Sequence, residues 1–317
     1  MAKGNPISEY RFSRRQFLSS STTFFGLCFC AHPFFESPAS IVQDDKVLAR
    51  LRDNLLQLVN EERAVEKLPP VAIDDLATRV ATKHAQEMAK HNYVSHWNRE
   101  GLKPYHRYSF AGGSHATEEN ISAADTTWSS QLKDLLQDTS YLHLRLYQEK
   151  PPTDGHRQTI LRPQQTHVGF GIALDELRLR VVELFVKKYV ELNQVSRKAK
   201  PGDSFTLSGK LLQPEHALMT VEVLYEPLPK QTDLSWLREP RPYALPTESV
   251  VLRPVLPPPF TYADRQKGVI QVDVDGRFTT PIKLFKKEPG VYTLVCWVKR
   301  YRNEKAFPAT ELCIRAE

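Results

Sequence analysis

The chain has 317 residues, of which 41% are hydrophobic, and a formal net charge of +6. This length exceeds what one hydrophobic core usually serves, so we expect two domains. Beyond the N-terminal region no run of about 20 apolar residues appears that could cross a membrane, and the modest, dispersed positive charge argues against a nucleic-acid partner.

The first 39 residues have the layout of an export signal: a basic front, a modestly apolar middle and a small-residue end. The stretch "SRRQFL" at residues 13–18 resembles the bacterial twin-arginine export motif. Small residues at Ser37 and Ala39 indicate cleavage after Ala39. We expect residues 1–39 to be a twin-arginine-type signal, and the mature chain to be periplasmic or extracellular in a bacterium, without a transmembrane span. The alternative is a disordered cytoplasmic tail with a chance arginine pair.

Two amphipathic helices are predicted between residues 45 and 92. The first has Asp44 or Asp45 as its N-cap and carries leucines at helical spacing. It stops before the proline pair at 69–70. The second begins at residue 74 or 75, and Asn92 can end it. His84 lies on its apolar stripe, so we expect a packed, hydrogen-bonded core histidine rather than a ligand.

A third helix is predicted over residues 129–148, and a β-hairpin over 168–186, where apolar residues alternate on either side of a "DE" turn. Helices come first and strands follow, without β-α-β alternation, which favours an α+β fold over a doubly wound sheet.

The character of the sequence changes near residue 195. Residues 193–202 read as a polar linker, and about seven short alternating runs within 203–317 predict an immunoglobulin-like β-sandwich. Residues 227–259 contain nine prolines and predict a long extended loop. Cys296 and Cys313 are the only cysteines after the predicted signal; they allow one disulfide in an oxidising compartment but no cysteine-based metal site.

Eight of the ten histidines fall between His84 and His167, which points to the first domain as the place for chemistry. Three short segments there carry candidate groups: His96, "EEN" at 118–120, and "GHR" at 155–157. Two histidines and a carboxylate can bind a divalent metal such as zinc. They can also form an acid–base site in which the glutamate orients a histidine. The residues by themselves leave both alternatives open.

Residues from about 55 to 185 resemble the CAP superfamily of cysteine-rich secretory, antigen 5 and plant pathogenesis-related proteins, in its bacterial, disulfide-poor branch. The motifs occur in the family's order: "VNEER", then "L…A…H…M…SH", a "G…P…R" loop, "EN" at 119–120, "HR…IL" at 156–161 and "GFG" at 169–171. Each motif is common, whereas the ordered set is fairly specific. The resemblance implies an α-β-α sandwich over residues 45–192 with a central cleft lined by two histidines and usually two glutamates.

Carried over by motif, the cleft residues are His96, Glu119 and His156. Glu149 is the nearest carboxylate for the second glutamate, and Asp154 is the next. On this reading His96, His156 and Glu119 would be the metal ligands.

Neighbouring residues of these motifs have structural interpretations. Arg107 would anchor its loop by bonding to carbonyls or to a carboxylate. His106 has no motif role, and we expect it on the surface. Asn120 would tie down a loop rather than take part in chemistry.

The first functional hypothesis is an exported CAP-domain protein that binds a metal ion or a small or lipidic ligand without established catalysis. The C-terminal sandwich would then be an interaction module for an envelope polymer or a protein partner. The alternative is a periplasmic metal-dependent or acid–base hydrolase acting on peptide or cell-wall material, with Glu119 as base or ligand. A third hypothesis is a structural interaction protein with a vestigial cleft. No serine or cysteine nucleophile motif and no HExxH stand in the sequence, so we assign no catalytic residue.

Overall fold

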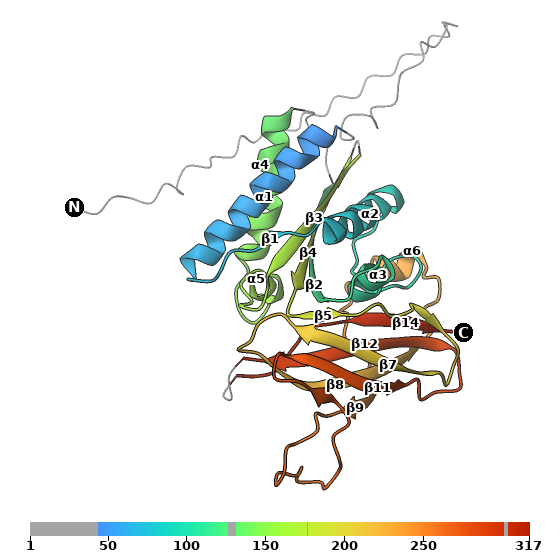
Figure 1. Cartoon of the computed structure of the whole chain (residues 1–317). Helices are drawn as coiled ribbons and strands as arrows, with labels where there is room; N and C mark the ends of the chain where they lie inside the picture. The colour runs from blue at the N-terminus through green and yellow to red at the C-terminus, as the bar shows by residue number, and fades with distance from the viewer. Residues whose placement is uncertain (1–43, 126–130, 176, 301–303) are drawn as a thin grey trace, which may run out of the picture. The chain divides into compact units, whose positions relative to one another are not determined.

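The computed structural model describes residues 44–125, 131–175, 177–300 and 304–317. The predicted export signal, residues 1–39, lies outside this part of the chain. None of the helices in the described ranges is long and apolar enough to cross a membrane. From residue 44 onward a helix–sheet–helix unit is followed by a two-sheet β unit, which makes the fold α+β (Figure 1).

The first two helices begin and end where the sequence predicted. In α1 (Asp45–Val65) the Asp44 side chain accepts a hydrogen bond from the Lys46 N–H at 2.8 Å. In α2 (Asp75–His91) Asp74 accepts one from the Ala77 N–H at 2.6 Å. These bonds satisfy N–H groups that the first turn leaves unpaired. Asn92 ends α2 in the left-handed conformation, with φ of 50°.

A four-stranded sheet lies in the middle of this unit, with strand order β1-β3-β4-β2. Its strands are β1 (Ala72–Ile73), β2 (Ala116–Asp125), β3 (His167–Leu174) and β4 (Arg178–Lys187). The antiparallel pairing of β3 with β4 confirms the predicted hairpin. Strand β2 was not predicted, because "ATEENISAAD" is mostly polar and shows no clear alternation. It pairs with β4 alone within this sheet, so its other edge is free for contacts.

Helices cover both faces of the sheet. On one face lie α1, α4 (Leu132–Tyr147) and α5 (Gly155–Ile160), and on the other α2 and α3 (Pro104–Phe110) (Figure 1). Strand β4 serves both cores, since Val181 packs with α1 and α4 whereas Val182 packs with α2. Successive residues of a strand point to opposite faces, so the nearly continuous apolar run in β4 follows from burial on both sides.

The C-terminal unit consists of two sheets, in the orders β10-β11-β7-β5 and β6-β14-β12-β8-β9, with β13 beside β12. Residues of both sheets share one hydrophobic core, as expected for a sandwich. The strands are β5 (Val190–Leu192), β6 (Lys198–Ala199), β7 (Ser204–Leu211), β8 (Ala217–Pro227), β9 (Glu248–Leu252), β10 (Gln271–Val272), β11 (Arg277–Lys283), β12 (Gly290–Lys299), β13 (Phe307–Pro308) and β14 (Leu312–Ala316).

Two features of this unit differ from the sequence analysis. Strands β5 and β6 fall in the predicted end of the first domain and in the linker, yet they pair with β7 and β14, so the sandwich begins before residue 203. The predicted proline-rich loop contains the short helix α6 (Leu234–Leu237) and strand β9. Short elements of this kind give little periodic signal in the sequence. Here their positions depend on pairing with strands that are distant in the sequence.

Cys296 and Cys313 are both free and buried. They lie on the neighbouring strands β12 and β14, but Cys313 stands opposite Thr293 rather than Cys296. The strand register therefore separates the two thiols, and the disulfide that the sequence allowed is not formed.

The "GFG" motif of β3 reflects a close approach of helix to sheet. A Cβ at Gly171 would lie 2.1 Å from the Ala81 carbonyl carbon, and one at Gly169 would lie 2.2 Å from the Thr78 nitrogen. Both positions face the backbone of α2, so a methyl group there would force the helix away from the sheet.

We expect Gly171→Ala to lower the free energy of unfolding by about 1–3 kcal/mol, because overpacking moves α2 off β3. Gly155→Ala is the control, since nothing lies within 4 Å of a Cβ built there. Urea unfolding of both variants measures the difference. Equal stability losses in the two variants would contradict this account.

Candidate functional site

The first candidate histidine is held by a buried ion pair. His96 follows α2, and its Nδ1 lies 3.0 Å from Oε1 of Glu119 on β2. The other carboxylate oxygen, Oε2, accepts a hydrogen bond from Arg107 of α3. The Arg107 guanidinium also donates to the carbonyl oxygens of His96 at 2.6 Å and Leu102 at 3.1 Å. The predicted anchoring role of Arg107 is therefore confirmed.

Glu119 is ionised but enclosed. Burial by itself would raise the pKa of its carboxyl, but the Arg107 charge and the bond to His96 outweigh burial and lower the pKa to about 2. The side chain is fully buried, and both of its oxygens are already bonded. Glu119 is thus placed to orient His96 rather than to bind a metal directly or act as a free base, which differs from the role we expected.

The second histidine also has its Nδ1 bonded to a glutamate. His156, in the first turn of α5, places Nδ1 at 2.6 Å from Oε1 of Glu149, and its backbone N–H donates to Oε2 at 3.0 Å. Glu149, which we named as the nearest carboxylate for the second glutamate, therefore pairs with His156. Asp154 instead accepts a hydrogen bond from Gln158 at 2.9 Å.

Neighbouring residues of β2 connect the two pairs. Glu119 binds His96, and the next residue, Asn120, donates from Nδ2 to the His156 carbonyl oxygen at 3.1 Å. The two imidazoles are 21% and 34% exposed, and neither Nε2 bonds to any residue in the described ranges. The arrangement therefore offers two oriented imidazole nitrogens beside one strand.

A tyrosine from the C-terminal unit completes this neighbourhood. The backbone N–H of Glu119 donates to Oη of Tyr243 at 2.7 Å, and the Tyr243 ring lies 4.8 Å from the His96 ring between centroids. Sequence reasoning missed Tyr243 because it lies in the proline-rich segment, more than a hundred residues away. No local motif signals its position.

Of the predictions for His84 and His106, one is confirmed and the other is wrong. His84 is buried and its Nε2 lies 2.8 Å from the Ser95 carbonyl oxygen, which confirms a core histidine. Burial lowers its pKa to about 3. The predicted surface position of His106 is wrong: it is 1% exposed, and Nε2 lies 3.1 Å from Glu226 on β8. The C-terminal unit covers α3 here, which the local sequence cannot show.

The donor set limits what metal could bind. Across the described ranges, no group of three or more His, Cys, Asp or Glu side chains is arranged to hold a metal ion. Two imidazole nitrogens would make up half of the four ligands of a tetrahedral zinc shell. Water or an exogenous ligand would have to supply the remaining positions.

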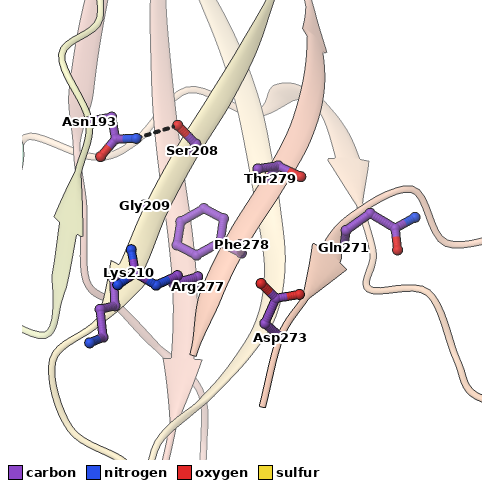
Figure 2. A pocket seen from close by; sticks show the side chains of 9 residues that line it. All are labelled: Asn193, Ser208, Gly209, Lys210, Gln271, Asp273, Arg277, Phe278 and Thr279. Carbon is purple, nitrogen blue, oxygen red and sulfur yellow. Dashed lines mark hydrogen bonds between the residues drawn. The ribbon is translucent and has the colours of Figure 1, made fainter. Parts of the chain in front are cut away.

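Two hollows elsewhere are not lined by the four candidate residues. Figure 2 shows one on the sandwich, between β7 and β11, where Asn193 donates to Ser208 at 2.7 Å and Lys210, Asp273 and Arg277 contribute charged groups. The other, near α5, has Asp154 and Arg157 in its wall. Neither offers a large apolar chamber beside His96.

The sequence resemblance implied a helix–sheet–helix domain, and the first part of the described chain has this architecture. Residues 56–186 match the family model described as the cysteine-rich secretory protein family, CAP. The chain therefore contains a CAP domain.

The chain resembles several proteins over this region. It is 28% identical over 118 residues to the uncharacterized protein YkwD of Bacillus subtilis, covering 37% of this chain and 40% of that protein. It is 23% identical over 181 residues to the cilia- and flagella-associated protein 184 of Tetrahymena thermophila, covering 57% of this chain and 22% of that protein. The chain thus spans less than half the length of these curated relatives.

Among solved structures, an extracellular protein from Bacillus anthracis containing an SCP domain matches with a TM-score of 0.35 and 24% identity. That match covers 46% of this chain and 44% of the other.

A buried charged network lies behind the site. His143 of α4 is fully buried; Nδ1 lies 2.6 Å from Glu183 of β4, and Nε2 lies 3.0 Å from Glu62 of α1. Asn120 donates to Glu183 at 3.2 Å as well as to the His156 carbonyl. Burial alone would lower the pKa of His143, but Glu183 and Glu62 outweigh it and raise the pKa to about 10. The network holds α1, α4 and β4 together and supports the start of α5 through Asn120.

This network predicts a pH-dependent stability. A histidine whose pKa rises on folding stabilises the folded state. This stabilisation is complete below the unfolded pKa of about 6.5, and it is lost as the pH rises toward the pKa of the folded state. We expect the free energy of unfolding to fall between pH 7 and 9.5. In Glu62→Gln, where one of the two carboxylates is neutral, the fall should be smaller by on the order of 1 kcal/mol. Urea unfolding across this range measures both curves, and parallel curves would contradict the prediction.

Proposed function

We propose that this chain is an exported CAP-domain protein in which His96 and His156 bind a divalent metal ion or a small ligand beside β2. The observation that carries the proposal is the shared arrangement of the two imidazoles. Each has Nδ1 bonded to a glutamate, and each keeps Nε2 free of bonds to described residues. Carboxylates in this position fix the tautomer and ring orientation and make Nε2 a better donor to a metal.

Zinc is one of the metals that imidazole nitrogens bind well. When bound, it would supply a Lewis-acidic centre that accepts oxygen ligands from solvent. The chain itself would provide His96 and His156 as ligands, with Glu119 and Glu149 as positioning residues. Because both Glu119 oxygens are occupied, binding without catalysis is favoured over hydrolysis with Glu119 as the base.

Export and the role of the C-terminal unit belong to the same proposal. The layout of residues 1–39 supports export to the periplasm or beyond the cell. The charged hollow of Figure 2 supports a role for the sandwich as an interaction module for an envelope polymer or a protein partner.

We expect untagged protein to bind one zinc ion, and His96→Ala and His156→Ala each to weaken binding at least a hundredfold. Glu149→Gln should weaken it about 10- to 100-fold, because the imidazole loses its orienting partner. Calorimetric titration with zinc, checked by elemental analysis, measures these affinities. His91→Ala is the control, since His91 ends α2 and contacts Arg99 rather than the site. Zinc binding that both site variants leave unchanged would overturn the proposal.

A further inference from the structure

The chain between β9 and β10, residues 253–270, forms a loop that projects from the sandwich beyond β9 (Figure 1). Both of these strands lie at the edges of their sheets. At the base of the loop the Val269 and Ile270 N–H groups donate to the Arg253 carbonyl at 2.8 and 3.0 Å. The Val255 N–H donates in turn to the Ile270 carbonyl at 2.8 Å. The loop therefore leaves the sandwich from a fixed base.

Two side-chain contacts hold the loop in shape further along the chain. The Tyr262 hydroxyl donates to the Pro254 carbonyl at 2.8 Å, and Arg253 pairs with Asp264 at 2.6 Å. The Arg253 guanidinium also lies over the Tyr262 ring, 5.1 Å from its centroid. Residues 255–261 lie between the bonded positions 254 and 262, and we call them the tip. The tip is therefore presented on a support that its own loop builds.

The tip is apolar and exposed. Its sequence, "VLPPPFT", contains no charged side chain. Phe260 is 67% exposed and Val255 is 45% exposed. Burial of apolar surface is favourable, and exposed apolar surface of this kind marks sites of interaction with proteins or membranes. The tip therefore offers a contact surface that the described residues leave uncovered.

The backbone of the tip has few free hydrogen-bond donors. Pro257, Pro258 and Pro259 carry no N–H group. The Phe260 N–H donates to the Pro257 carbonyl at 3.0 Å, and the Val255 N–H is bonded at the base of the loop. Three prolines and two bonded N–H groups leave five of the seven tip residues without a free donor. Because an unpaired backbone donor is costly in an apolar medium, this segment can enter a lipid boundary at lower cost than an ordinary loop.

Positive charge lies beside the tip. Arg265 and Lys267 are exposed, and within the described residues neither forms an ion pair. Arg253 and Asp264 offset each other, so residues 253–270, with three cations and one anion, carry a net charge of +2. Basic residues are attracted to anionic lipids over a distance of about a Debye length. An uncharged apolar tip beside free cations is complementary to the acyl boundary and the phosphate groups of an anionic bilayer.

We infer that residues 253–270 form a membrane-docking loop, whose tip enters the headgroup region of an anionic phospholipid bilayer while Arg265 and Lys267 contact the lipid phosphates. A bilayer fits the tip better than an added β-strand does, because strand pairing uses N–H groups that the prolines lack. The inference goes beyond the proposed function and does not depend on His96 or His156. It gives the C-terminal unit a role in holding the chain at a membrane surface.

Vesicle sedimentation tests this inference. The protein is made without residues 1–39, since the described fold begins at residue 44 and the apolar stretch of the predicted signal would bind lipid by itself. One arm uses vesicles of equal parts phosphatidylcholine and phosphatidylglycerol, and the other uses phosphatidylcholine alone. We expect binding to the anionic vesicles to be at least tenfold tighter than to the neutral ones, and to weaken as salt is added.

Two sets of changes in the loop separate the apolar and the charged contributions. Phe260→Ser should weaken binding to anionic vesicles on the order of tenfold, because the tip loses its largest apolar side chain. Arg265→Gln combined with Lys267→Gln should weaken anionic binding on the order of tenfold and leave neutral binding unchanged. In Phe260→Trp, brominated lipid should quench the tryptophan fluorescence more strongly than in wild-type protein, since the new indole contacts lipid.

Matched controls change similar side chains away from the loop. Val65→Ser removes an apolar side chain that is 74% exposed at the end of α1. Arg50→Gln combined with Lys133→Gln removes two exposed cations from α1 and α4. Both controls should bind anionic vesicles as wild type does. Urea unfolding should give equal stability for all variants, because every changed side chain is exposed.

Several outcomes would overturn the inference. These are wild-type protein that binds neither kind of vesicle, a Phe260→Ser or double-glutamine loop variant that binds as wild type does, and a control that is weakened as much as its loop counterpart. Equal quenching in Phe260→Trp and wild type would also overturn it. If sedimentation velocity without vesicles shows a wild-type dimer that Phe260→Ser abolishes, the tip is an interface between copies of the chain and the inference fails.

Discussion

The free edge of strand β2 is the constraint on which the rest of the structure depends. An edge strand presents unpaired N–H and C=O groups, and proteins must cover or protect them. Here the C-terminal unit covers them: the Ala116 N–H donates to the Ala309 carbonyl, the Thr117 N–H to the Glu311 carboxylate, and the Glu119 N–H to Tyr243. The two units are therefore joined along the same strand that carries the candidate site.

Because β2 is an edge strand, residues that pack on either face of the sheet can also contact its unpaired edge. Glu119 points toward α3 and fixes His96 through an ion pair with Arg107, whereas Asn120 points toward α5 and fixes the start of the helix that carries His156. The alternation of a strand thus lets β2 contact the loop of His96 with one residue and the start of α5 with the next. Each histidine is then oriented by a carboxylate, so the site consists of two similar halves rather than one continuous cluster.

The buried charged groups of this domain fix the positions of neighbouring segments more than they stabilise the fold. Removing the charges of Glu119 and Arg107 from water costs free energy. Bonds to both carboxylate oxygens and to the guanidinium offset this desolvation cost. His143 repeats the pattern between Glu62 and Glu183. Removing one member of such a set would leave a buried charge unpaired. These sets therefore fix where the loop after α2 and the start of α5 lie.

Much of the CAP domain could be read from the sequence, because its signals are local. Helix caps at Asp44 and Asp74, the alternation of β3 and β4, and the ordered motifs indicated the helices, the hairpin and the candidate residues His96, Glu119 and His156. The tertiary structure decided what no local pattern encodes: that β2 is an edge strand, that His106 is buried, that Glu119 stands behind His96, and that Tyr243 joins the site. These depend on contacts between residues a hundred or more positions apart, whose free energy appears only when both fold units pack together.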